Sequence, residues 1–110
     1  SHLVESLLFA DLYPQDLIIE IEGLELLKGF KGIKTHEHKF LIPCLDNSQD
    51  IKALSEQVTK ILSEVQTYGF ILRGHGLYVW GDTVKDAKRH LEVFEYIFKY
   101  KIANHRARAN

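Results

Sequence analysis

The sequence predicts an α/β domain in which helices cover a β-sheet. Segments whose apolar residues recur at helical spacing alternate along the chain with short segments rich in β-branched residues. The composition, 45% hydrophobic and 26% charged, is that of a globular protein. A length of 110 residues favours a single domain over residues 1–110, or a portion of one. The predicted order is helix, strand, helix, strand, helix, strand, strand, helix.

The first half of the chain contains two predicted helices and two predicted strands. Residues 3–12 have helical spacing and Pro14 follows, where a helix cannot continue. Residues 17–21 are predicted to be a strand, and residues 24–29 one or two helical turns closed by Gly29. A polar loop at 31–38 leads to a strand at 39–43. Because proline lacks an N–H, Pro43 predicts that this strand lies near a sheet edge or ends there.

The second half begins with a helix for which Asn47 is the predicted N-cap, with Asp50 at the third helical position. Its apolar stripe comprises Ile51, Leu54, Val58, Ile61, Leu62 and Val65. Strands are predicted at 70–73 and 77–80, interrupted by Gly74, His75 and Gly76. Thr83 is the predicted cap of the last helix, with Asp86 three residues on, and its core face comprises Ala87, Leu91, Phe94, Ile97 and Phe98.

Charge and composition exclude several classes of protein. A formal net charge of -1 argues against nucleic-acid binding, which usually requires a basic face. No apolar run approaches the roughly 18 residues of a membrane span. The single cysteine, Cys44, excludes an internal disulfide and fits the cytoplasm. Because the chain starts at Ser1 and contains no methionine, we expect its natural start to lie upstream.

His75 is the strongest candidate for a functional residue in the sequence. The glycines on either side permit unusual backbone angles and the close approach of a ligand. Glu25, just past a predicted strand, is the natural carboxylate to transfer protons beside it. The alternatives stay open at this point: His75 in a turn that only hydrogen-bonds to backbone, and Glu25 facing solvent on a short helix.

The other candidates favour ordinary structural roles. His36 and His38 form a His-x-His pair that could share zinc on a strand, but the flanking lysines and the loop context favour a solvated turn. His90 is assigned to a charged helix face and His105 to the tail. Cys44 is predicted to be a small buried residue, since no basic group is obviously placed to lower its pKa.

Four groups of residues together carry a resemblance to a known family. They are Glu-Leu-Leu-Lys-Gly at 25–29, Thr-His-Glu-His at 35–38, Ile42-Pro43 with Asp46-Asn47 and Asp50-Ile51, and Arg-Gly-His-Gly-Leu-Tyr-Val-Trp-Gly at 73–81. The chain resembles the class II aldolase and adducin superfamily, and within it the branch of methylthioribulose-1-phosphate dehydratases. The likeness covers essentially the whole chain and corresponds to the C-terminal half of those enzymes. It implies a class II aldolase-like, three-layer α/β/α fold truncated at its N-terminus.

The resemblance also implies a metal site. In that family an upstream His-x-His pair and a later histidine hold a catalytic Zn²⁺; His75 matches the later one, and His2 falls at the second position of the pair. The alternative for His2 is a cloning remnant. Glu25 matches the general acid/base carboxylate. Lys28 and Arg73 are candidate substrate-binding residues that would help electrostatically with the phosphate or the enediolate, with structural ion pairing as the alternative.

The implied activity is zinc-dependent loss of water from 5-methylthioribulose 1-phosphate, giving 2,3-diketo-5-methylthiopentyl 1-phosphate in methionine salvage. The resemblance implies a cytoplasmic homo-oligomer, a tetramer at full length, with a sugar phosphate as its partner and neither nucleic acid nor membrane. The 110 residues alone are expected to be inactive. Two alternatives remain. One is a class II sugar-phosphate aldolase or 4-epimerase, over which Trp80 and the Thr-His-Glu-His segment favour the dehydratase. The other is a non-catalytic adducin-like interaction domain, which the presence of both Glu25 and His75 disfavours.

Overall fold

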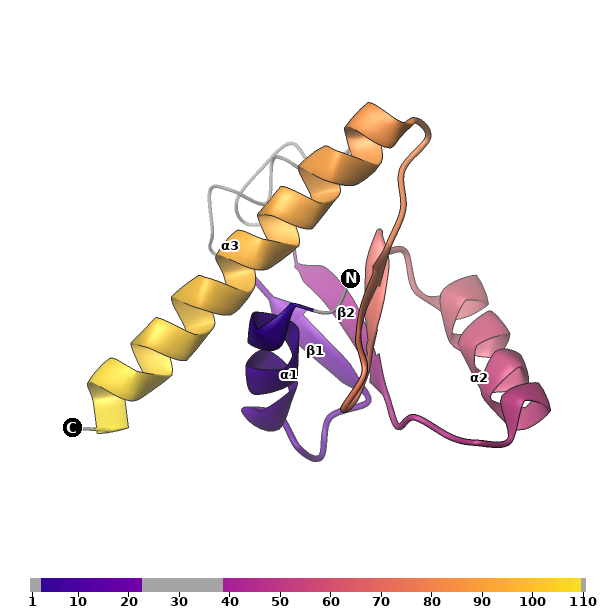
Figure 1. The fold of residues 1–110 in the computed structure, drawn as a ribbon, viewed down its shortest axis with the longest axis horizontal. Helices are drawn as coiled ribbons and strands as arrows, with labels where there is room; N and C mark the ends of the chain where they lie inside the picture. Colours follow the sequence, from indigo (N-terminus) through magenta and orange to yellow (C-terminus); the bar gives the residue numbers. More distant parts are fainter. Residues whose placement is uncertain (1–2, 23–38, 110) are drawn as a thin grey trace.

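The computed structural model describes residues 3–22 and 39–109. The helical turns predicted at 24–29 and the loop at 31–38 lie outside these residues, as do His2, Glu25 and Lys28. The described elements follow the predicted order along the chain (Figure 1). They are α1 (Val4–Asp11), β1 (Ile18–Ile21), β2 (Phe40–Leu45), α2 (Ile51–Glu64), β3 (Gly69–Leu72), β4 (Gly76–Val79) and α3 (Val84–Ala109).

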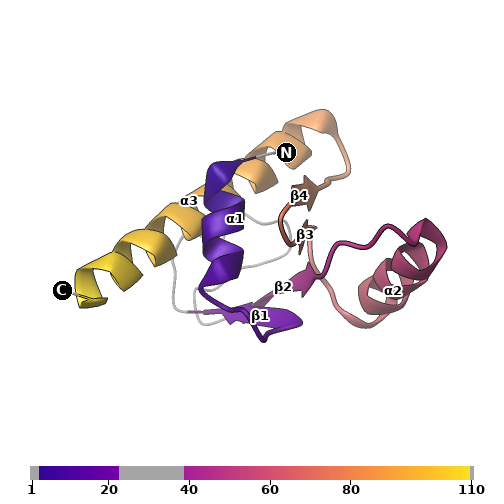
Figure 2. The ribbon, with the colours of Figure 1, turned by 60° about the horizontal axis from the view of Figure 1, so that its bottom comes forward.

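The four strands form one mixed sheet in the order β1-β2-β3-β4. The outer pairs, β1 with β2 and β3 with β4, are antiparallel, whereas β2 and β3 run parallel. Helices α1 and α3 lie on one side of the sheet and α2 on the other (Figure 2). The α/β/α arrangement predicted from the resemblance is therefore confirmed.

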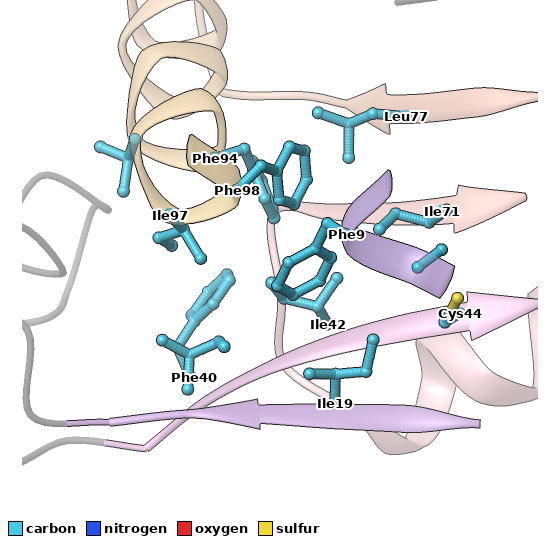
Figure 3. Packing of buried hydrophobic residues seen from close by; sticks show 13 residues of the cluster. Phe9, Ile19, Phe40, Ile42, Cys44, Ile71, Leu77, Phe94, Ile97 and Phe98 are labelled. Carbon is cyan, nitrogen blue, oxygen red and sulfur yellow. The ribbon is translucent and has the colours of Figure 1, made fainter. Parts of the chain in front are cut away.

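The main core lies between the sheet and the pair α1 and α3. Phe9 of α1 packs against Phe98 of α3 with ring centroids 4.7 Å apart, and Phe40 of β2 meets Phe94 of α3 at 5.7 Å. Figure 3 shows these rings facing aliphatic side chains of the strands. As predicted, Phe94, Ile97 and Phe98 are buried. The strands and helices contribute Phe9, Ala10, Ile19, Ile21, Phe40, Ile42, Cys44, Ile71, Leu77, Val93, Phe94, Ile97 and Phe98.

A smaller core lies under α2 on the opposite face. Because side chains alternate along a strand, Phe70 and Leu72 point to this face whereas Ile71 points to the main core. Ile61 is the buried residue of α2, and Leu54, Val58, Leu62 and Val65 pack around it half-buried. The prediction that Ile51 belongs to this stripe was wrong: it is 71% exposed, at the first helical position, one turn ahead of Leu54.

The two long helices begin at side-chain caps. For α2 the cap is Asp50, whose carboxylate accepts a hydrogen bond from the N–H of Ala53 at 3.1 Å, so the prediction of Asn47 was wrong. The hydroxyl of Ser48 in turn accepts from the N–H of Asp50 at 3.1 Å. For α3 the predicted cap is confirmed, because the Thr83 hydroxyl accepts from the N–H of Asp86 at 3.0 Å.

Pro43 lies inside β2, so the prediction that this strand ends there was wrong, although β2 does lie next to the edge strand β1. It pairs with Ile18 of β1, and β2 continues for two residues beyond it. The N–H of Cys44 donates to Leu17 on the β1 side at 2.7 Å, and successive residues of a strand point their backbone groups in opposite directions. The Pro43 nitrogen therefore faces the β3 side, where pairing begins only at Cys44, and no ladder bond is lost.

Among the helices in the described parts of the chain, none is both long and apolar enough to cross a membrane. The prediction of one domain over residues 1–110 stays a prediction.

Candidate functional site

His75 lies on the tight turn that joins β3 to β4. Its N–H donates to the carbonyl of Leu72 at 3.0 Å, which closes a four-residue turn. Gly74, the third residue of this turn, has a φ of 74°, as the third residue of a type II turn requires. Gly76 follows with a φ of 153°. The two glycines thus supply the unusual backbone angles that their sequence pattern indicates.

The imidazole of His75 is half-buried and is held by Tyr78. The Tyr78 hydroxyl forms a hydrogen bond with Nε2 of His75 at 3.1 Å, and the two rings lie 5.8 Å apart at an interplanar angle of 17°. Tyr78 also stacks on Phe70 at 5.1 Å and 12°. The imidazole therefore sits at the end of a row of aromatic rings on β3 and β4, and its orientation is defined.

Arg73, two residues before His75, directs its guanidinium at the end of α1. Nη1 donates to the carbonyl of Ala10 at 2.9 Å, and Nη2 donates to those of Tyr13 at 2.6 Å and Asp16 at 2.8 Å. Nε lies 3.6 Å from a carboxylate oxygen of Asp46. These contacts place Arg73 as a link between distant parts of the backbone. Its predicted role in substrate binding stays a prediction.

His90 is fully buried, so its assignment to a solvated helix face was wrong. Its Nδ1 lies 2.8 Å from the carbonyl oxygen of Trp80, and its ring lies 4.3 Å from that of Tyr68. The sequence held a signal for this: position 90 stands three after Ala87 and one before Leu91, inside the apolar stripe of the helix. His105, by contrast, is exposed.

Cys44 is buried at 2% exposure, as predicted. Burial raises the pKa of its thiol to about 11, and the positive charge of Arg73 acts in the opposite direction but less strongly. A thiol in this state is not a nucleophile near neutral pH, because the thiolate is the reactive form.

The described residues, 3–22 and 39–109, contain no group of three or more His, Cys, Asp or Glu side chains that could hold a metal ion. Of the predicted ligands, His75 is described and is a suitable donor: a half-buried imidazole on a defined turn. His2 and the proton-transfer candidate Glu25 lie outside the described residues, as do Lys28, His36 and His38.

Several curated proteins, all named methylthioribulose-1-phosphate dehydratase, are similar to most of this chain. A methylthioribulose-1-phosphate dehydratase of Marinobacter nauticus is 40% identical over 109 residues, which cover 98% of this chain and 52% of that protein. The protein of that name from Xanthomonas oryzae pv. oryzae is 41% identical over 91 residues, covering 83% and 40%. That from Stenotrophomonas maltophilia is 46% identical over 86 residues, covering 78% and 40%. The chain spans about half, or less, of these relatives' length.

A family model described as the class II aldolase and adducin N-terminal domain matches residues 2–102. This range includes the four strands of the described residues, the turn that carries His75, and most of α3. The α/β/α layering agrees with the resemblance seen in the sequence. The chain therefore belongs to the class II aldolase and adducin N-terminal domain family.

Proposed function

We propose that this chain is the C-terminal part of a zinc-dependent dehydratase that removes water from 5-methylthioribulose 1-phosphate in methionine salvage. The product would be 2,3-diketo-5-methylthiopentyl 1-phosphate. The observation that carries the proposal is His75, an oriented imidazole on a glycine-flanked turn, in a chain 40% identical over 98% of its length to a relative named for this reaction.

The proposal concerns five predicted residues, of which the structure describes His75 and Arg73. His75 and His2 would hold Zn²⁺, together with a histidine upstream of the chain. A bound zinc ion supplies Lewis-acid polarisation of the substrate carbonyl. Glu25 would take the proton from the neighbouring carbon and help expel the hydroxyl group as water. Lys28 is the candidate for the phosphate; for Arg73, the contacts with α1 favour a different role, argued below.

The surroundings of the enzyme are also part of the proposal. We expect a cytoplasmic protein, on the basis of its single buried, free thiol, and a tetramer at full length. In an oligomer, a neighbouring subunit would bury exposed aromatic rings such as those of Tyr78 and Trp80, which are 43% and 37% exposed on and just beyond the strand that follows the His75 turn.

The test is turnover by the full-length protein. Zinc-loaded protein is incubated with 5-methylthioribulose 1-phosphate and, in parallel, with fuculose 1-phosphate and ribulose 5-phosphate. Formation of the diketone from the first substrate alone is the expected result. Carbon–carbon cleavage or epimerisation of the other two would instead identify an aldolase or an epimerase. Turnover of none of them, with zinc well below one ion per subunit, would favour a non-catalytic interaction domain.

A further inference from the structure

Gly74, in the middle of the turn that carries His75, stands in open space. Among the described residues, apart from Gly74 itself and its two chain neighbours, no heavy atom lies within 4 Å of the point where a Cβ on Gly74 would stand. The hydrogen bond from His75 N–H to Leu72 closes the turn within the β3–β4 hairpin. The Tyr78 hydroxyl orients the imidazole ring, so the further question is what holds the backbone of the turn in place.

Arg73 supplies that attachment at the residue next to Gly74. Its side chain is 19% exposed, and its two Nη atoms bond to three carbonyls at the end of α1 and in the connection to β1. Its own N–H donates to Leu45 of β2 at 2.8 Å. One residue therefore joins the turn to α1, to the α1–β1 connection and to the central strand.

Hydrogen bonds from a charged donor are stronger than those between neutral groups. The carbonyls of Ala10 and Tyr13 also accept backbone N–H groups, from Tyr13 at 3.0 Å and from Asp16 at 3.3 Å, so Arg73 binds to a stretch of backbone that is itself held in turns. The planar guanidinium presents several donors in a fixed fork, so one side chain can bind three carbonyls at once. The ion pair with Asp46 adds little, because that carboxylate is 93% exposed. The carbonyl bonds are thus the main attachment.

We propose that Arg73 is a positioning residue: it anchors the β3–β4 turn to the C-terminal end of α1 and thereby holds His75 in the direction its metal requires. The inference rests on the proposed function of His75 as a zinc ligand. It differs from a role in binding substrate, because a guanidinium engaged by three carbonyls of its own chain acts on the site through the backbone.

The experiment compares full-length wild-type protein with Arg73→Ala and Arg73→Lys. Arg89→Ala is the matched control, since Arg89 lies in α3 and makes a half-exposed ion pair with Asp86 at 3.8 Å. Zinc affinity is measured by competition with a chelator, and amide hydrogen exchange is followed at His75 and at Trp80, whose N–H donates to Tyr68. Circular dichroism tests whether each variant is folded. If Arg73→Ala does not fold, Arg73→Lys takes its place in the comparison.

Arg73→Ala should weaken zinc binding roughly ten- to a hundredfold, the range for groups that orient a metal ligand. Exchange at the His75 amide should accelerate while exchange at Trp80 is unchanged. Arg73→Lys should fall between Arg73→Ala and wild type, because an ammonium keeps the charge but not the fork. Arg89→Ala should match wild type in both measurements.

Two results would overturn the inference. Unchanged zinc affinity in Arg73→Ala with a raised KM would identify a substrate-binding residue instead. Equal acceleration of exchange at His75 and Trp80 would show general destabilisation rather than loss of an anchor. A wild-type protein that binds no zinc, with selective acceleration at His75 in Arg73→Ala, would contradict the proposed function while supporting the anchoring of the turn.

Discussion

The Nδ1 atom of His90 in α3 lies 2.8 Å from the carbonyl oxygen of Trp80, just beyond the end of β4. Trp80 also donates its N–H to the carbonyl of Tyr68 at 3.0 Å, and the Tyr68 ring packs on the imidazole. One buried histidine thus ties the long C-terminal helix to the end of the β3–β4 hairpin. The His75 turn lies at the other end of that hairpin, so this contact helps to fix the strands that carry the site.

His90→Leu should destabilise the protein by about 1–3 kcal/mol, because the partly buried hydrogen bond to the carbonyl of Trp80 is lost and a leucine cannot replace it. Urea unfolding followed by circular dichroism measures the loss. His105→Leu is the control, since that histidine is exposed near the end of the same helix, and its effect should be within about 0.5 kcal/mol. Equal effects of the two substitutions would contradict the structural role of His90.

His75→Ala and Glu25→Gln should separate metal binding from proton transfer. The first removes a proposed ligand and should abolish stoichiometric zinc in the full-length protein. The second should keep zinc and lower kcat by roughly a hundred- to ten-thousandfold, the usual contribution of a general acid or base. Metal analysis and turnover assays are run on both, with His105→Ala as the control. Retained turnover in Glu25→Gln would remove Glu25 from the mechanism.

Gly74→Ala should lower stability through the backbone alone. Its φ of 74° is unfavourable for a residue with a Cβ, by roughly 1–2 kcal/mol, although the space around the position would admit the methyl group. Gly74→Asn should cost less, because asparagine adopts this conformation more readily. Thermal unfolding of both variants is the measurement, and an alanine variant as stable as the asparagine one would argue against the left-handed conformation.

Cys44 should make stability depend on pH at the alkaline end. Its pKa is raised from 9.0 to about 11 in the folded protein, mainly by burial. The contribution of the neutral thiol to the free energy of unfolding is complete below a pH of about 9. As the pH rises further, the thiol of the unfolded chain loses its proton before that of the folded protein, so this contribution is lost between about 9 and about 11. Wild type should therefore lose more stability than Cys44→Ala over this window in urea titrations. Parallel curves for the two proteins would contradict the raised pKa.

Much of the fold could be predicted from the sequence because its signals are local. The apolar stripe through Phe94 and Phe98, the Thr83 cap and the glycine-flanked turn each depend on residues a few positions apart. The cap of α2 was misplaced because Asn47 and Asp50 are both good caps, and only the course of the chain between them selects one. Pro43 was misplaced because its cost depends on where pairing with β3 begins.

The alternation of helices and strands, the turn at His75 and the motifs that indicate the family can all be read from the amino-acid sequence. The contacts of His90 and Arg73 follow only from the packing of distant segments. His90 is buried because Trp80 and Tyr68 come to it from the hairpin, and Arg73 reaches Ala10, 63 residues away. Histidine and arginine side chains can lie in solvent or donate hydrogen bonds to backbone carbonyls. Which of the two occurs depends on which distant carbonyls the packed helices and strands bring within reach.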